Sequence, residues 1–466
     1  MADPAPDARP DQSRSLPLRA ALGGLKRGFA ALGVRNYRLY WTGQVVSLVG
    51  TWMQQVSLPW LVLSLEGTPL QLGFVAVLQF GPAMILAPFG GVLADRIEKR
   101  HALLATQIGA CIQAFVLFVL TATGVVEIPM VLVMAFFLGL VNAVDMPLRL
   151  ALAPDLVPRN LLSNAIALNS MAFNAARVVG PALAGVIIAI GTGVTGSATA
   201  GVAVNLGINT VTYAAVFIGL LRMNPREIRR QERPEQHPPV LDSLREGVAY
   251  AVRTPLVLWS LVLLGGVAAF GFNFQILLPL FAVGILGLGA FGYGALFAAM
   301  GIGSLAGSLT LAFMHNRRAI PLMLVGGAVF ATLLVGIAAS RTVWIAAPLI
   351  VGAGYASMLM INTVNATVQA NVSDALRGRV MALYVTVFAG TAPIGGLFAG
   401  AVAEAWGTPA AFLAGAALSA LTLLIVALGL RAAHRRGKLG VTIIGTPSAT
   451  PARGVGPEPR PASTAR

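Results

Sequence analysis

Apolar stretches long enough to cross a membrane recur along almost the whole chain, with short polar breaks between them. A helix needs about 20 mostly apolar residues to cross the hydrocarbon core of a bilayer. The pattern therefore predicts an all-α membrane protein. Twelve transmembrane helices are expected, at residues 38–64, 70–94, 102–126, 129–152, 161–190, 197–221, 255–284, 291–314, 319–340, 343–370, 377–404 and 408–431.

Three polar regions divide these helices into two sets of six. Residues 1–37 form a cytoplasmic N-terminal tail, and residues 432–466, rich in Pro, Thr and Arg, form a cytoplasmic tail that we expect to be disordered. A linker covers 222–254, because Met223–Pro239 is charged, carries four prolines and cannot build a core. The rest of the linker predicts a short helix along the membrane surface. The helices form one bundle at 38–221 and another at 255–431.

The two sets also resemble each other in sequence. An offset of 215 residues aligns the fifth helix of each set, pairing Gly180, Leu183, Ala184 and Gly185 with Gly395, Phe398, Ala399 and Gly400. The pattern favours two pseudo-symmetric six-helix bundles. Parallel repeats of this kind place a binding site between the halves, near the bilayer midplane.

Charge supports the membrane assignment and orients the chain. Only 11% of the residues are charged and 57% are hydrophobic, whereas charge in soluble proteins is nearer a quarter. The net charge of +15 comes from Lys and Arg in the tails, the linker and every second loop, with Arg341 expected alone on the opposite side. By the positive-inside rule we expect a multi-pass protein of the cell membrane with both termini cytoplasmic. The basic residues then meet anionic lipid, and no nucleic-acid partner is expected.

Several chemistries are disfavoured by the residues present. The single cysteine, Cys111, excludes an intrachain disulfide, and the four histidines lack the spacing of a metal site. No nucleotide-binding loop occurs, so we expect no ATP drive, no cofactor and no metal. A membrane-embedded lipid-modifying enzyme would need acids or histidines gathered at one face, and every histidine lies outside the predicted helices.

Four predicted helices carry polar residues at helical spacing. They are the first, fourth, seventh and tenth, which are equivalent in a doubled three-plus-three arrangement. Their residues are Gln44, Thr51 and Gln55; Asn142, Asp145 and Arg149; Asn273 and Gln275; and Asn362, Asn365 and Gln369. Such side chains either line a substrate cavity or only hydrogen-bond between helices.

Arg177 is the one basic residue near the middle of a predicted helix, with Asn174 one turn earlier. An arginine at that depth costs several kcal/mol unless it is paired or hydrated. It would anchor an anionic or carbonyl-rich substrate or modulate a proton site. Alternatively, it clamps onto backbone carbonyls or onto Asp145.

Asp145 is the one carboxylate placed well inside a predicted helix. A buried carboxylate with a raised pKa could carry a proton between two states of a transporter. The competing interpretation is a fixed ion pair with Arg149 or Arg96 that holds a cytoplasmic gate shut. The sequence leaves both open.

The segment Gly91–Arg100 (GVLADRIEKR) resembles the loop signature of the major facilitator superfamily, with Glu98 where a second glycine is usual. The resemblance implies that Asp95 caps a neighbouring helix and that Arg96 pairs with an acid, which latches the cytoplasmic side. It makes Gly91, Asp95, Arg96 and Arg100 gate residues, together with Arg149. A second copy after the eighth helix, at 314–318, is degenerate.

Gly180-Pro181 with Gly185 is similar to a motif of the antiporter branch, which implies that Gly180 and Pro181 take part in the conformational change and that transport is export. Further pieces resemble the enterobactin-exporter-like branch, also described as transmembrane secretion effectors. These pieces are Arg35–Leu39, Asn142–Arg149, Phe272–Phe274 and Arg377–Leu383.

The expected function is secondary active export of a hydrophobic or amphipathic small molecule by alternating access, with proton antiport and a monomeric protein. Candidate substrates are drugs, macrolides, siderophores or other secondary metabolites. The alternatives are an importer of a small organic solute, a non-transporting receptor and, more remotely, the lipid-modifying enzyme.

Overall fold

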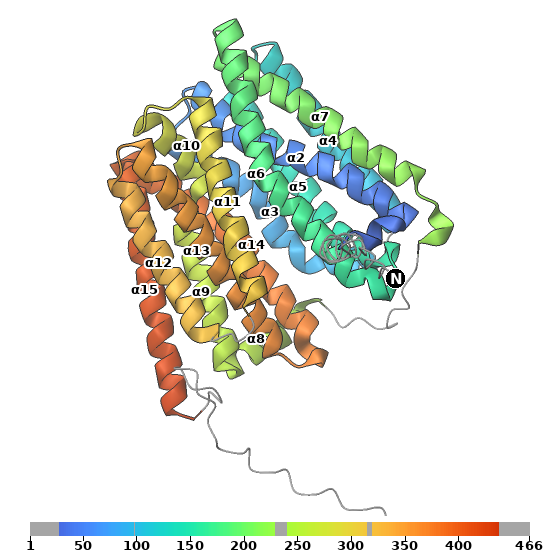
Figure 1. The fold of residues 1–466 in the computed structure, drawn as a ribbon, viewed down its shortest axis with the longest axis vertical. Helices are drawn as coiled ribbons and strands as arrows, with labels where there is room; N and C mark the ends of the chain where they lie inside the picture. Colours follow the sequence, from blue (N-terminus) through green and yellow to red (C-terminus); the bar gives the residue numbers. More distant parts are fainter. Residues whose placement is uncertain (1–27, 97, 229–239, 315–318, 438–466) are drawn as a thin grey trace, which may run out of the picture.

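The computed structural model describes residues 28–96, 98–228, 240–314 and 319–437 (Figure 1). Its regular structure is helical throughout these residues. Within these ranges, no side chain is described for residues 87–96, 240, 241, 243, 244, 374 and 375. The long helices are α2 (Arg35–Ser64), α3 (Pro69–Arg96), α4 (Lys99–Ala122), α5 (Ile128–Leu152), α6 (Leu162–Thr195), α7 (Ala198–Arg222), α8 (Val240–Arg253), α9 (Pro255–Gly271), α10 (Phe274–Gly284), α11 (Ala290–Phe313), α12 (Ala319–Ala339), α13 (Val343–Ala370), α14 (Asp374–Trp406) and α15 (Thr408–Arg435). Short 3₁₀ turns lie at Ala30–Gly33, Ala153–Leu156, Arg159–Leu161 and Pro225–Glu227.

Eleven spans in the described part of the chain are long and apolar enough to cross a membrane, with α9 and α10 together forming one of them. The 30-residue α2 is not among these eleven. It carries buried polar side chains such as Asn36, Ser47 and Gln54, and it packs centrally against α6 and α7. The predicted class, an all-α membrane protein, is confirmed.

The helices pack as two sets. In the first, α2 contacts α6 and α7, while α3 contacts α5 and α4 contacts α5 and α7. In the second, α11 and α12 contact α13, and α15 contacts α9, α12 and α14. The sets meet mainly where α3 crosses α14 and α6 crosses α11, with smaller contacts from α10 to α2 and α3 and from α8 to α3.

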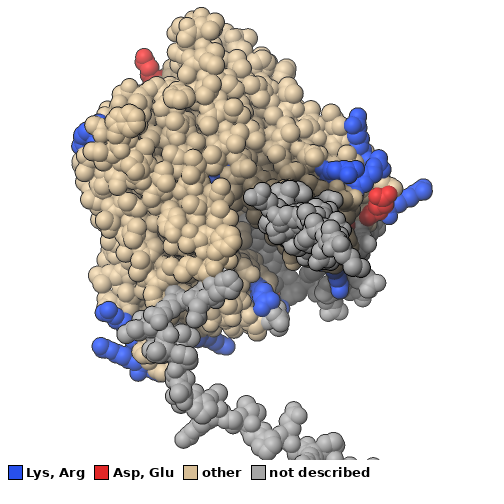
Figure 2. All heavy atoms as spheres, viewed as in Figure 1, with Lys and Arg blue, Asp and Glu red and all other residues tan. Residues whose placement is uncertain are grey.

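One side of the molecule carries the short connections that follow α2, α4, α6, α10, α12 and α14, and we call it the short-loop face. The opposite side, which we call the basic face, carries the connections after α3, α5, α7, α11 and α13. Lys and Arg gather along the lower and right-hand edges of the molecule, where α8 and the last turns of α7 and α15 lie (Figure 2).

Near the short-loop face, glycines let the two bundles approach closely. A Cβ atom placed on Gly73 of α3 would lie 2.6 Å from the carbonyl oxygen of Gly396 in α14. A Cβ on Gly294 of α11 would likewise lie 2.6 Å from the carbonyl oxygen of Pro181 in α6. Because real Cβ atoms essentially never come so close, only glycine permits either crossing.

A polar contact reinforces the α3–α14 crossing. The backbone N–H of Leu70, in the first turn of α3, donates a hydrogen bond of 2.8 Å to Oε2 of Glu404 near the end of α14. A carboxylate at a helix N-terminus is favourable because the first N–H groups have no partner within their own helix. Glu404 of one bundle thus caps a helix of the other. Away from this face, α6 and α11 diverge and the bundles splay apart (Figure 1).

The sequence repeat corresponds to equivalent packing in the two bundles. A Cβ on Gly180 of α6 would lie 2.5 Å from the Cβ of Trp52 in α2, and Gly395 of α14 is pressed against the equivalent helix at Ala269 and Asn273. The fifth helix of each half therefore touches the first helix of its own half through the paired glycine. This equivalence is what two pseudo-symmetric bundles require.

One helix expected from hydropathy is interrupted, and the linker contains the short helix that its sequence predicts. The seventh predicted helix, 255–284, is broken at Phe272 and Asn273 into α9 and α10, and the Asn273 side chain donates to the Ala269 carbonyl at 2.8 Å. In the linker, α8 lies against the start of α14, where Glu246 pairs with Arg379 and the Tyr250 hydroxyl donates to the Asn371 carbonyl at 2.9 Å. Most of Met223–Pro239 and of both tails lies outside the described residues.

Candidate functional site between the two bundles

Arg177 lies about halfway along α6, next to the α6–α11 crossing. Only 6% of its surface is exposed, and its carbonyl oxygen would lie 3.0 Å from a Cβ on Gly301 of α11. Its guanidinium carbon lies 5.8 Å from the ring centroid of Trp52 in α2, a cation–π contact. Its Nε is buried without a hydrogen-bond partner, and the guanidinium forms no ion pair with any described carboxylate. Neither Asp145 nor a backbone carbonyl clamps it.

Further aromatic rings extend from the Trp52 ring that contacts this cation. The Trp52 ring meets Phe173 of α6 edge-on at 5.6 Å and Phe297 of α11 at 6.3 Å between centroids. Phe297 in turn contacts Tyr293, which stacks on Trp60 at 6.0 Å. A column of rings from both bundles therefore runs from Arg177 toward the short-loop face.

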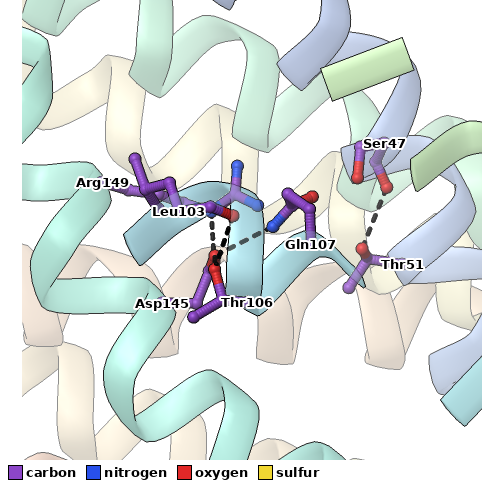
Figure 3. Close-up of polar contacts among 7 residues, drawn as sticks. All are labelled: Ser47, Thr51, Leu103, Thr106, Gln107, Asp145 and Arg149. Carbon is purple, nitrogen blue, oxygen red and sulfur yellow. Dashed lines mark hydrogen bonds and ion pairs between the residues drawn. The ribbon is translucent and has the colours of Figure 1, made fainter. Parts of the chain in front are cut away.

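Asp145 of α5 lies in a second polar cluster, within the first bundle (Figure 3). Its Oδ1 accepts hydrogen bonds from the Thr106 hydroxyl at 2.6 Å and from Gln107 Nε2 at 2.9 Å, both on α4. Its Oδ2 accepts from Nε of Arg149, one turn later in α5. Three donors from two helices hold the carboxylate, so its pairing with Arg149 is present in this conformation.

This cluster is suited to holding a charge but is not fully satisfied. Arg149 Nη1 and Gln107 Oε1 are buried without partners. A proton added to Asp145 would cancel the attraction that holds Arg149 and would remove an acceptor from Thr106 or Gln107. The arrangement can therefore act as a fixed pair in one protonation state and rearrange in the other.

A third polar cluster, centred on Gln54 of α2, was missed from the sequence. Gln54 Nε2 donates to Gln113 Oε1 of α4 at 3.1 Å, and Asn209 Nδ2 of α7 donates to Gln54 Oε1. Thr212 joins through a hydrogen bond of 3.1 Å to Asn209. The polar signal in the sequence was the pair of mid-helix amides, Gln113 and Asn209.

The other predicted cavity residues of the first bundle lie near the same helices without forming one network. Gln44, Gln55 and Asn142 are half-buried, and the Oε1 of Gln44 has no partner. Two residues bond within their own helices: Thr51 donates to the Ser47 carbonyl at 2.9 Å (Figure 3), and Asn174 donates to the Ser170 carbonyl at 2.8 Å.

In the second bundle the predicted residues are neutral and locally paired. Asn362 Nδ2 donates to the Ser308 hydroxyl of α11 at 2.9 Å, and Gln369 Nε2 donates to Asn365 Oδ1 one turn earlier in α13. Asn273 lies at the α9–α10 break, and Gln275 is half-buried beside it.

Apart from Arg149, which pairs with Asp145, the predicted gate residues divide into three groups. Gly91, Asp95 and Arg96 lie in the last turns of α3, where no side chain is described, so the contacts of the proposed latch are not described. Arg100 bonds within the first bundle, donating from Nε to the Leu220 carbonyl at the end of α7 at 2.8 Å. Gly180 and Pro181 lie at the crossings described above.

The family described as transmembrane secretion effectors matches residues 26–438 of the chain. The enterobactin exporter EntS of Citrobacter koseri is 27% identical over 356 residues, which cover 75% of this chain and 80% of that protein. The staphyloferrin A transporter of Staphylococcus aureus is 30% identical over 154 residues, covering 33% of this chain and only 39% of that protein.

Solved structures share the fold at low sequence identity. A bacterial homologue of the human lysosomal transporter Spinster, inward-facing and occupied, aligns with a TM-score of 0.66 and 15% identity, over 85% of this chain and 97% of that chain. A bacterial homologue of the iron transporter ferroportin, inward-facing, aligns with a TM-score of 0.65 and 14% identity, over 84% and 98%.

Proposed function

Because the chain belongs to the transmembrane secretion effector family of the major facilitator superfamily, we propose that this multi-pass membrane transporter exports a hydrophobic or amphipathic small molecule by alternating access. The observation that carries the proposal is the position of Arg177. It is a buried cation at the point where the two bundles meet, and no described carboxylate pairs with it. A transporter of this architecture binds its substrate at that level of the membrane.

The direction of opening follows from charge. Lys and Arg mark the cytoplasmic side of membrane proteins, so we place the basic face and both termini in the cytoplasm of a cell that carries this protein in its inner or plasma membrane. The glycine crossings then close the outer side, and the splayed side faces the cytoplasm. In this state a substrate reaches Arg177 from inside the cell, as loading of an exporter requires.

Release to the outside requires the reverse arrangement. The α3–α14 and α6–α11 crossings must loosen near the short-loop face while the basic ends of the bundles come together. The contact between Leu70 and Glu404 would break, and the ring column between Arg177 and Trp60 would separate, because its members belong to both bundles. Gly180 and Pro181 lie next to the helix crossings that would move.

We assign the coupling to protons and the proton site to Asp145. It is the one carboxylate among the described mid-span residues, and it is tied to α4 and to Arg149 rather than across the bundles. Protonation would free Arg149 and loosen α5 from α4 within the first bundle. Proton entry could thus be exchanged for substrate exit by a protein acting as a monomer.

The relatives guide the choice of substrate panel. Two of them are described by their names as transporting enterobactin and staphyloferrin A. We extend the class to siderophores and similar secondary metabolites, and keep drugs and macrolides as further candidates.

The test uses inverted membrane vesicles with an acidic interior, in which an exporter pumps substrate inward as protons leave. We expect one compound class to collapse the pH gradient in vesicles that contain the protein and not in vesicles without it. Compounds that bind the purified protein but neither accumulate nor move protons would contradict proton-coupled export.

A further inference from the structure

Among the described basic residues buried in the protein, Arg177 differs in how its charge is balanced. Arg149 pairs with Asp145 and Lys99 pairs with Asp155. At the membrane edges, Arg100 and Arg341 donate to backbone carbonyls at the ends of helices, each at 2.8 Å. Within the described part of the chain, Arg177 has neither a carboxylate nor a carbonyl partner, although it is more deeply buried than Arg149.

The energetic cost of that arrangement indicates a missing anion. An uncompensated cation at the bilayer centre is costly, and the one favourable contact seen, over the face of Trp52, offsets only part of that cost. A cation kept at this cost is stabilised when an anionic group arrives. None of the described carboxylates pairs with Arg177, and an anionic substrate would supply the missing charge.

The aromatic rings next to Arg177 indicate which chemical group the anionic group of the ligand is attached to. Phe173 and Arg177 are four residues apart, so they share one face of α6. Phe297 is fully buried, whereas Phe173 is 43% exposed and so has free ring surface. Because α6 begins at the basic face, a molecule arriving from that face meets Phe173 before it reaches the guanidinium. A flat ring can stack there while its charged group extends toward Arg177.

We infer that Arg177, Trp52 and Phe173 form a subsite for an organic anion whose negative group is attached to a planar aromatic ring. This inference rests on the proposed export function and narrows its substrate class. It disfavours cationic drugs, because no described carboxylate near Arg177 would balance a second positive charge. It assigns the charge of the substrate to Arg177 and its ring to Trp52 and Phe173.

The test measures binding to the purified full-length protein by isothermal titration with four probes of similar size. They are 2-naphthoate, its saturated analogue decalin-2-carboxylate, neutral 2-naphthalenemethanol and cationic 2-naphthylmethylammonium. We expect 2-naphthoate to bind about tenfold more tightly than the saturated or neutral probe, and the cation not to bind measurably. Equal affinities, or preference for the cation, would overturn the inference.

Substitutions separate the two contributions. R177Q should bind 2-naphthoate and the neutral 2-naphthalenemethanol equally well, but should still prefer 2-naphthoate to decalin-2-carboxylate. F173L and W52L should bind 2-naphthoate and decalin-2-carboxylate equally well, but should still prefer 2-naphthoate to 2-naphthalenemethanol. R341Q and W344L, which change an arginine and an exposed tryptophan at the short-loop face, should retain both preferences. If R177Q fails to fold, W52L and F173L still test the role of the rings. R177K then tests the role of the charge, because it keeps the cation and should keep the preference for 2-naphthoate over 2-naphthalenemethanol.

These experiments distinguish a failure of the subsite proposal from a failure of the export proposal. Correct probe preferences with no vesicle transport would contradict export and leave the subsite intact. Transport of a cationic or aliphatic compound that is unaffected by W52L and F173L would leave export intact and overturn the subsite.

Discussion

The fourth helices of the two bundles, α5 and α13, carry the same arrangement with different chemistry. In α5, Asp145 and Arg149 form an ion pair one helical turn apart. In α13, Asn365 and Gln369 form an amide hydrogen bond with the same spacing. The packing of the halves is repeated, but of these two described helices only α5 carries an ion pair.

The fifth helices show the same asymmetry. Gly180 and Gly395 make equivalent contacts, yet the offset of 215 that pairs them sets Arg177 of α6 against Ala392 of α14. A duplicated scaffold has kept the glycines that its helix crossings need. The charged residues Asp145, Arg149 and Arg177 of the first bundle have uncharged residues at the equivalent positions of the second. We therefore expect the first bundle to supply substrate anchoring and proton coupling, and the second to supply the moving wall against which it closes.

The largest effect is expected at Arg177. Arg177→Ala should abolish export while the protein remains inserted, because the anchor is lost but no structural ion pair is broken. Vesicle transport and the amount of membrane-inserted protein should be measured together, with Arg341→Ala as the matched control. Normal export by Arg177→Ala would show that the cation has no role, and failed insertion would support a structural one.

Neutralising the α5 pair in two steps tests the comparison itself. Asp145→Asn alone leaves Arg149 buried and unpaired, and breaking a buried pair in this way costs about 3–5 kcal/mol. The double variant Asp145→Asn, Arg149→Gln copies the α13 pair and should recover much of that stability. Neither variant should release protons when substrate moves. Thermal unfolding and proton release would be measured on both, and a double variant less stable than Asp145→Asn would contradict the equivalence of the two pairs.

The contact between the bundles at the short-loop face should have a smaller effect. Glu404→Gln keeps the side-chain shape but removes the charge that favours the N-terminus of α3, a loss of about 1 kcal/mol. We expect roughly a fivefold shift from the inward-facing toward the outward-facing state. Spin labels attached at Glu127→Cys and Thr342→Cys, in a Cys111→Ser background, measure the distance between the two bundles at the short-loop face. This distance should be longer in Glu404→Gln than in the protein with Glu404. Glu66→Gln on the same face should leave the distances unchanged, and an unchanged distribution in Glu404→Gln would exclude a role of the Leu70–Glu404 contact in holding the short-loop face closed.

The smallest effect is expected in α13. Hydrogen bonds of this kind within membranes contribute about 0.6 kcal/mol each. Asn365→Ala should therefore change export by about threefold or less and leave proton coupling intact. A loss comparable to that of Asp145→Asn would mean that the second half shares the chemistry and that the asymmetry is superficial.

The helices were predictable because hydropathy reports membrane depth directly, and Arg177 stood out because a charge at that depth is rare. The break between α9 and α10 was not predictable, because Phe272 and Phe274 on either side of Asn273 keep that region apolar. The partners of Asp145 were also beyond reach. Thr106 and Gln107 lie on α4, and their approach depends on how α4 and α5 are rotated against each other, which no single-helix pattern encodes.

The aromatic surroundings of Arg177 show the same limit. Trp52, Phe173 and Phe297 come from three helices of two bundles, and in sequence each is an ordinary apolar residue of its span. Their meaning depends on the crossings that Gly180 and Gly294 permit. The sequence could indicate an anchor for a negative charge, but the rings beside it became visible only in the packed structure.

The most direct test of the asymmetry records substrate transport and proton movement together in liposomes containing the purified protein. One sample holds the wild-type chain and the other holds the double variant Asp145→Asn, Arg149→Gln. We predict that the wild type exchanges protons for substrate, and that the variant still binds substrate but carries it without proton movement. Undiminished proton exchange by the variant would contradict the assignment of coupling to the first bundle.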